Sequence, residues 1–184
     1  MSAPLISGIQ QVGIGCQHVP EPWHWYRQVL GFDVPVFDEK ADAPLMTPYT
    51  GGKVHSRQAA LAINMAGGGG LEIWSFTSRV SQPANFKAEI GDLGINAIRF
   101  KAPDVKKAHD WVKSHSKEAT GPLVKLPEGE GFWGTDPYGN VFQITSDATW
   151  FQTKGKNVGG VAGVVIGVSD IDKAVVFYQN LLQP

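Results

Sequence analysis

The alternation of apolar and polar positions predicts the same strand-and-helix opening three times along the chain. Apolar runs typical of strands occupy residues 9–15, 95–101 and 161–168. After each run, apolar residues recur three or four positions apart, which is the spacing of a helix with one buried side. These stripes contain Val105, Ala108 and Val112 in the second stretch and Ile171, Val175, Tyr178 and Leu182 in the third.

Local signals predict where these helices begin and end. The first helix is expected at residues 22–30, because Pro22 suits a first turn and Gly31 suits the position just past a helix end. Asp104 is a good N-terminal cap for the second helix, and Ser169 or Asp170 for the third.

Further strands are expected after the first two helices. In the first unit they cover 32–37, 57–65 and 71–76, and four consecutive glycines, Gly67 to Gly70, join the last two as a hairpin. In the second unit they cover 132–135 and 141–145, separated by a turn at 136–140, and the strand before them is poorly marked. The polar stretch 38–53 is expected to form a long surface loop that could act as a lid.

The three openings are internal repeats. One ungapped shift places Gly8 on Gly160, Val12 on Val164, Ile14 on Ile166, Gly15 on Gly167, Tyr26 on Tyr178 and Leu30 on Leu182. A second, weaker shift places Gly8 on Gly94 and Ile14 on Phe100. Since the third unit stops after its helix, we expect the natural chain to continue past Pro184, or this tail to pack in an unusual place.

Composition and charge narrow the functional classes. The 184 residues carry 16 Lys and Arg against 17 Asp and Glu, a net charge of −1. This balance gives no electrostatic reason to bind nucleic acid or an anionic membrane, and no apolar run approaches the roughly 20 residues that span a bilayer. The single Cys16 and the absence of a secretory pattern at the N-terminus favour a reducing cytoplasm.

Two phrases, together with the repeated unit, indicate a family. They are Trp25-Tyr26-Arg27-Gln28-Val29-Leu30-Gly31-Phe32 and Asp136-Pro137-Tyr138-Gly139-Asn140-Val141-Phe142-Gln143-Ile144. The sequence resembles the vicinal oxygen chelate superfamily, which includes glyoxalase I, extradiol dioxygenases and bleomycin resistance proteins. The resemblance implies an α+β fold of paired βαβββ modules that form a cupped mixed sheet. It implies a two-module domain at 1–150, with modules at about 8–77 and 94–146, and a linker and the start of a further module at 151–184.

The same resemblance implies four positions for the ligands of a divalent metal ion, on the first and last strand of each module. They hold Gln11, Glu72, Ala97 and Gln143. Gln11, Glu72 and Gln143 offer one carboxylate and two amide oxygens, a set that would hold Mg²⁺ or Ca²⁺ only weakly. A dioxygenase triad needs two histidines, and these positions hold none.

Strand alternation extends the expected cup beyond the metal positions. Arg99 should share a face with Ala97, and Trp74 with Glu72. Arg99 either pairs with Glu72 or binds a ligand carboxylate or phosphate. Trp74, Phe132 and Trp133 offer flat apolar surface, either to a ligand or as part of the core.

The five histidines are expected to lie in different environments. His55 could reach the mouth of the cup and bind substrate, whereas His18 is expected in a local turn. His24, His109 and His115 are expected on the solvent side of their helices.

Three functions remain open on the sequence. The first is a cup that binds a small organic molecule, with a degenerate metal site. The second is a metal-dependent lyase or isomerase of the lactoylglutathione lyase type, with Glu72 as the catalytic base. The third is a noncatalytic half of a longer four-module protein. The resemblance also allows a homodimer.

Overall fold

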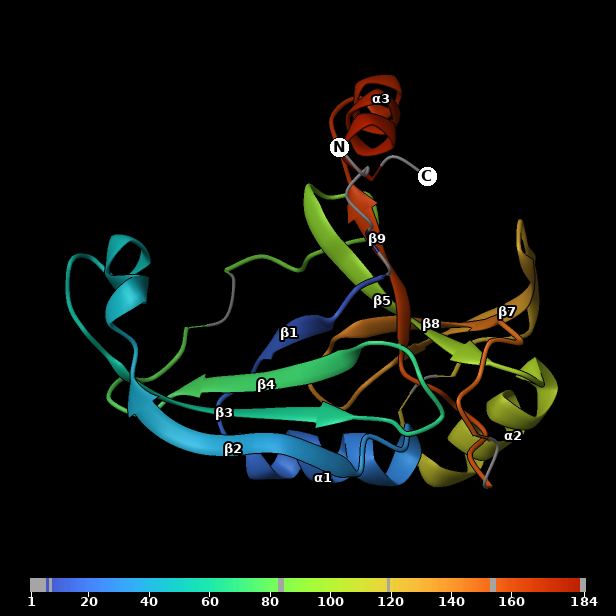
Figure 1. Cartoon of the computed structure of the whole chain (residues 1–184), viewed down its shortest axis with the longest axis horizontal. Coiled ribbons are helices and arrows are strands. Elements are labelled where there is room, and N and C mark those ends of the chain that lie inside the picture. The colour runs from blue at the N-terminus through green and yellow to red at the C-terminus, as the bar shows by residue number, and fades with distance from the viewer. Residues whose placement is uncertain (1–5, 7, 83–84, 119, 153–154, 183–184) are drawn as a thin grey trace, which may run out of the picture.

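The first βαβββ module occupies the N-terminal half of the chain. The computed structural model describes residue 6 and residues 8–82, 85–118, 120–152 and 155–182. The module contains β1 (Gln11–Gly15), α1 (Pro20–Val29), β2 (Val34–Asp42), the 3₁₀ helix η1 (Pro44–Tyr49), β3 (Ser56–Ile63) and β4 (Gly70–Phe76) (Figure 1).

The second module repeats this order, and the opening of a third unit follows it. The second module contains β5 (Gly94–Ala102), α2 (Val105–His115), β6 (Val124–Leu126), β7 (Gly129–Thr135) and β8 (Val141–Ser146). The third unit contains β9 (Val161–Gly167) and α3 (Ile171–Leu182). The predicted α+β class and the repeated modules are therefore confirmed. The predicted domain division at residue 150 stays a prediction.

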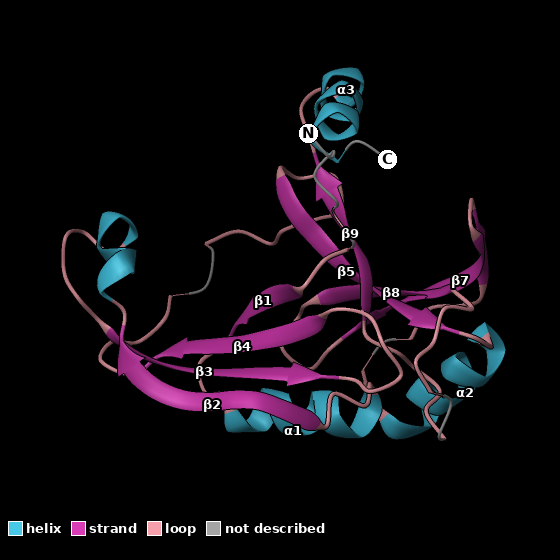
Figure 2. Cartoon of the chain, viewed as in Figure 1, coloured by secondary structure: helices cyan, strands magenta, loops and turns pink. Residues whose placement is uncertain are grey.

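The strands form two mixed sheets, each with a parallel pair between the first and last strand of a module. One sheet has the order β1-β4-β3-β2, and the other has the order β6-β7-β8-β5-β9 (Figure 2). β9 runs antiparallel to β5, with Ala97 opposite Val165 and Arg99 opposite Gly163. The hydrogen bonds thus pair the second module with the third unit, whereas β1 belongs to a different sheet.

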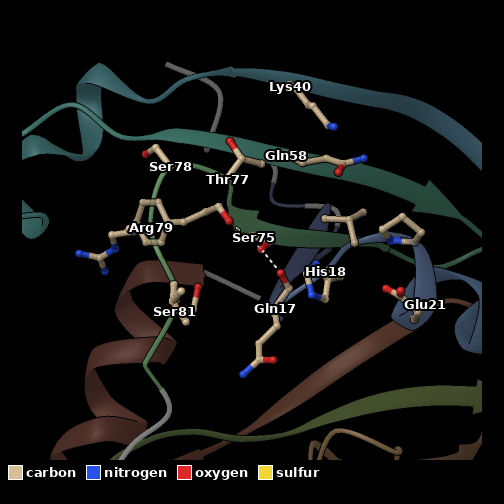
Figure 3. A pocket seen from close by; sticks show the side chains of 14 residues that line it. Gln17, His18, Glu21, Lys40, Gln58, Ser75, Thr77, Ser78, Arg79 and Ser81 are labelled. Carbon is tan, nitrogen blue, oxygen red and sulfur yellow. Dashed lines mark hydrogen bonds between the residues drawn. The ribbon is translucent and has the colours of Figure 1, made fainter.

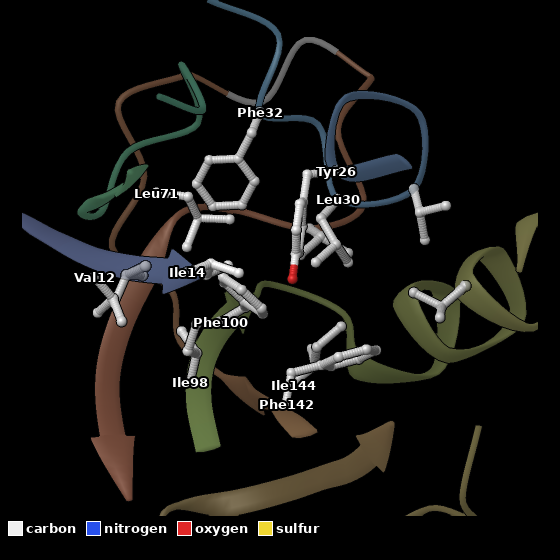
Figure 4. Packing of buried hydrophobic residues seen from close by; sticks show 14 of the residues in the cluster. Val12, Ile14, Tyr26, Leu30, Phe32, Leu71, Ile98, Phe100, Phe142 and Ile144 are labelled. Atoms are coloured by element: carbon white, nitrogen blue, oxygen red, sulfur yellow. The ribbon is translucent and has the colours of Figure 1, made fainter. Parts of the chain in front are cut away.

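The two sheets and the helices α1 and α2 enclose one shared core. Figure 4 shows Val12 and Ile14 of β1 facing Ile98 and Phe100 of β5, with Tyr26 of α1 beside them. All are buried, because alternate residues of each strand point to this side. The opposite side of each sheet, which we call its outer face, carries the predicted site residues.

A buried carboxylate ties the two modules together. Asp136, 3% exposed, accepts hydrogen bonds from the hydroxyl of Tyr26 (2.5 Å) and from the backbone N–H groups of Tyr138 and Asn140. The side-chain amide of Asn140 donates a fourth bond at 2.7 Å. Burial, and then the adjacent Asp136 carboxylate, raise the pKa of Tyr26 well above its ordinary value.

This contact predicts a pH dependence of stability. Because the pKa of Tyr26 is raised in the folded state, its contribution to stability is complete below the unfolded-state pKa of about 10 and is lost as the pH rises above it. We expect Tyr26→Phe to lower the free energy of unfolding by about 1–2 kcal/mol at pH 8. Urea denaturation at rising pH should show this difference shrinking above about pH 10. A difference that stays constant there would contradict the assignment.

The predicted helix boundaries are largely confirmed. Asp104 accepts from the N–H of Lys107, and Asp170 from the N–H of Lys173, as N-terminal caps. Gly31, directly after α1 and its C-cap residue, has a φ of 75°, which glycine adopts without strain. The start of α1 was predicted two residues late, because Pro20 and not Pro22 opens the helix.

The prediction of a loop at 38–53 is wrong in its first part. β2 extends to Asp42, and only the segment after it is irregular or 3₁₀-helical. Polar side chains occupy this strand because it is a sheet edge, where cross-strand partners stabilise them. Asp38 accepts from Gln58, Glu39 pairs with Arg57, and Asp42 accepts from Ser56.

The third unit lies against the rest of the molecule through its strand and the residue before it. Gly69 and Val161 exchange backbone hydrogen bonds, and Gly160 N–H donates to Gly67 O at 2.7 Å. α3 projects away from the core (Figure 1), and all of its described side chains remain at least partly exposed. Its apolar stripe is therefore open, as in Ile171, which is 71% exposed.

Candidate functional site

Two of the predicted metal positions meet on the outer face of the first sheet. Gly13 pairs with Glu72 in the parallel β1–β4 register, which places Gln11 close to Glu72 on the same face. The amide Nε2 of Gln11 donates a hydrogen bond to Oε2 of Glu72. Neither Gly13 nor Gly15 has an atom within 4 Å of where a Cβ would stand, so the surface beside this pair is open.

A cleft begins where this strand pair ends. Trp74 stands two residues after Glu72, and its ring meets the ring of Phe76 edge-on at 4.4 Å between centroids. The cleft has a volume of about 570 Å³, and Cys16, Pro22 and Tyr138 also contribute to its walls. Burial, and then the charge of Glu21, raise the pKa of the Cys16 thiol to about 11, so the thiol stays protonated and weakly nucleophilic near neutral pH.

A second, more polar cleft of about 820 Å³ adjoins the first (Figure 3). The two clefts share Gln17, His18, Glu21 and Ser81. Lys40 and Arg79 bring positive charge to the polar cleft, and the guanidinium of Arg79 lies 4.1 Å from the centre of the Phe76 ring. His55 stands at its border, where Nδ1 lies 3.1 Å from Oγ of Ser78, itself a lining residue.

The second pair of metal positions lies on the other sheet. Gln143 is in register with Arg99 on β5 and with Trp133 on β7. Arg99 pairs with Glu128, at 3.0 Å between Nη2 and Oε1. The alternative in which Arg99 pairs with Glu72 is therefore wrong: Glu128, in the turn between β6 and β7, is its partner.

The structure decides between the two alternatives for Phe132 and corrects the expectation for His109. Phe132 points into the core and is fully buried, because it alternates with Trp133 along β7. His109 is not a surface residue: its Nε2 lies 3.1 Å from Gly121 O, and its ring meets Phe132 edge-on. His115 is exposed, as expected, and its ring stacks on Trp111.

The donor groups do not fit a complete divalent metal centre. Gln11 and Glu72 supply one carboxylate and one amide, and Ala97 has no donor atom. Gln143 is in register with Arg99, whose positive charge disfavours a cation nearby. Within the described ranges, no three His, Cys, Asp or Glu side chains gather as a metal site would require.

Comparison with known proteins agrees with this arrangement of modules. Residues 8–144 match the Glyoxalase/Bleomycin resistance protein/Dioxygenase superfamily. The chain belongs to this superfamily. Among curated proteins, no sequence matches the chain. None of the described helices has the length and apolar character needed to cross a membrane.

Solved structures of the superfamily share the fold at low sequence identity. A glyoxalase family protein from Bacillus cereus is 13% identical with a TM-score of 0.63, covering 79% of this chain and 97% of its own. A putative dioxygenase from Bacillus subtilis is 16% identical with a TM-score of 0.65, covering 98% of this chain and 56% of its own. Glyoxalase I from Zea mays is 16% identical with a TM-score of 0.60, covering 96% of this chain and 55% of its own.

Apart from Trp74, sequence reasoning missed the residues that line the two clefts. His18 carried the one usable signal, because it stands where Asp104 and Asp170 cap the other two helices. α1 accordingly begins without a side-chain cap. In the first module this position, His18, does not cap a helix and lines both clefts instead.

Proposed function

We propose that the protein binds a small organic molecule in the cleft beside Trp74, without a divalent metal ion. The observation that carries this proposal is the pairing of Glu72 with Gln11, next to an open surface that leads into the 570 Å³ cleft. Sites for small molecules are typically clefts of about 300–1,000 Å³ with mostly apolar walls and a few polar groups. Trp74, Pro22 and Tyr138 provide such walls here.

The polar residues have distinct tasks in this proposal. Trp74 packs against a ring or an aliphatic group of the ligand. Glu72 accepts a hydrogen bond from the ligand, and Gln11 orients its carboxylate. If the bound molecule extends along the open surface to Glu72 and reacts, this carboxylate serves as the base, since a carboxylate can remove a proton from an adjacent carbon or hydroxyl. His55 and His18 contribute at the polar end of the joined clefts.

A lyase or isomerase of the glyoxalase I type is the second proposal. It is favoured by the convergence of Gln11 and Glu72, which supply two of the superfamily's ligand positions on one face. The likeness to glyoxalase I from Zea mays over 96% of this chain is consistent with it. This function would need further ligands from another module, whether in a longer four-module protein or in a second copy. We also propose that two copies of the chain form a homodimer. A cytoplasmic location is proposed as well, because reducing conditions there suit the free thiol of Cys16.

The first test measures metal content and ligand contact together. We expect purified protein to retain well below one equivalent of metal after dialysis against chelator and reloading with Mg²⁺, Mn²⁺, Ni²⁺ or Zn²⁺. Aromatic fragments should shift the NMR signal of the Trp74 indole N–H. This signal is assigned by its absence from the spectrum of Trp74→Phe. Trp74→Leu should weaken their binding about tenfold or more. The matched control is Trp133→Leu on the other sheet, which should leave binding unchanged.

A change at the carboxylate separates the two proposals. Glu72→Gln keeps the shape of the side chain and removes its charge, so we expect weaker fragment binding, by about three- to tenfold, with unchanged folding. Circular dichroism should report the same melting temperature for both proteins. One equivalent of retained metal that is lost in Glu72→Gln would instead favour the lyase or isomerase.

A further inference from the structure

The second sheet carries a cationic group whose hydrogen bonds are incomplete. Arg99 projects from the outer face of β5, with its side chain 24% exposed. Glu128 pairs with Nη2, yet the Nε of the same guanidinium is buried and has no partner among the residues that the structure describes. Buried N–H groups of charged side chains are rarely left unpaired, so this atom calls for an explanation.

The geometry of the guanidinium shows what Glu128 does not satisfy. Nε and Nη2 lie on one edge of the planar group, and a carboxylate can accept from both at once. Glu128 takes only the Nη2 position. Its side chain is 49% exposed and comes from the turn between β6 and β7, so it can move aside without disturbing either sheet.

The residues around Arg99 suit an organic acid. Gln143 is in register beside Arg99 and adds an amide donor, and Trp133 is the next residue across the sheet. On the other side, Gly163 lies opposite Arg99, and a Cβ there would be 3.5 Å from Cδ of the arginine. The stem of Arg99 therefore lies against Gly163, which has no side chain, and Trp133 stands two strands away, beyond Gln143.

We propose that the outer face of the second sheet binds the carboxylate of a small organic acid, which displaces Glu128 and accepts from Nε and Nη2 of Arg99. Glu128 occupies part of the site in the free protein and competes with the ligand. The apolar part of the acid rests on Trp133, and Gln143 donates to the second carboxylate oxygen. This site is separate from the cleft beside Trp74 and does not depend on the function proposed there.

The test uses sodium benzoate as the probe, with the NMR signal of the Trp133 indole N–H as the readout. We expect Glu128→Gln to bind benzoate about tenfold more tightly than the wild type, because the competing charge is gone. Arg99→Lys keeps the positive charge without the two-donor edge and should abolish binding in the Glu128→Gln background. Benzamide, the neutral isostere, should bind neither protein, and inorganic phosphate should bind more weakly than benzoate.

The chain offers a matched control at its other outer-face arginine with a carboxylate partner. Arg57 pairs with Glu39 at 2.7 Å between Nη2 and Oε1, and its side chain is 18% exposed. It differs in that its Nη1 also donates to Glu39 O, and its Nε is not an unpartnered buried atom. Glu39→Gln should therefore leave benzoate binding at the wild-type level.

Three results would overturn the proposal. The first is equal benzoate affinity in the wild type and in Glu128→Gln. The second is an equal gain in Glu39→Gln, which would mean that any freed arginine suffices. The third is phosphate binding that is tighter than benzoate binding, which would assign the site to tetrahedral anions.

Discussion

Asp136→Ala should destabilise the protein more than any other single change considered for this chain, by about 3 kcal/mol or more. The carboxylate is 3% exposed and accepts four hydrogen bonds. Its loss leaves the Tyr26 hydroxyl buried without an acceptor and frees the turn before β8. Because Tyr26 belongs to the first module and Asp136 to the second, the change acts on the contact between the modules. Urea denaturation followed by circular dichroism measures it.

A second carboxylate on the surface provides the control for this result. Asp38 accepts one hydrogen bond from Gln58 on the exposed edge of the first sheet. Asp38→Ala should change the free energy of unfolding by no more than about 0.5 kcal/mol. A loss of less than about 1 kcal/mol in Asp136→Ala would mean that water replaces its partners, contrary to the burial of the site.

Gly160→Ala is expected to have the second-largest effect, a loss of about 2–3 kcal/mol. A Cβ at this position would stand 2.6 Å from Gly69 O and 2.9 Å from Gly67 O. Both are backbone atoms of the turn between β3 and β4, so neither can rotate away. Relief requires β9 to move off this turn, which breaks the hydrogen bond between Gly160 N–H and Gly67 O.

Gly163→Ala on the same strand is the matched control. Its Cβ would meet Arg99 Cδ at 3.5 Å, an ordinary van der Waals contact. We expect a change within about 0.5 kcal/mol in thermal or urea unfolding. Equal losses in both variants would show that backbone freedom in β9, and not the contact with the first module, determines the effect.

The features predicted correctly from sequence were those that depend on neighbouring residues. The two-residue period of a strand is local, so Gln11 with Glu72 and Phe132 with Ile144 can be sorted by face once the strands are placed. A helix cap such as Asp104 can be predicted because its side chain bonds a backbone N–H in the first turn of the same helix. The same rule separates Phe132, on the core side of β7, from Trp133 on its outer face.

Features that depend on distant partners were missed. β2 reads as polar loop because its charged residues are stabilised by β3, at the sheet edge. The partner of Arg99 depends on the register of the hairpin that holds Glu128, whose first strand has only three residues. The burial of His109 depends on Phe132, which lies on a strand beyond α2. No pattern around His109 itself reports that contact.

The ladder between β5 and β9 has a consequence for solubility. An uncovered strand edge is a template for strand pairing with other molecules, and β9 covers that edge of β5 but becomes an edge strand of the second sheet itself. The first sheet has no such cover along the outer edge of β1 in the part of the chain described. Gln10 O and Cys16 N–H are turned to β4, so the alternate residues Gln11, Gly13 and Gly15 turn their peptide groups outward. These three residues carry no charge, yet the second module limits the access of another molecule to this edge, because Ala88 to Ile90 and Ile95 to Ile98 line the same hollow as Gly13.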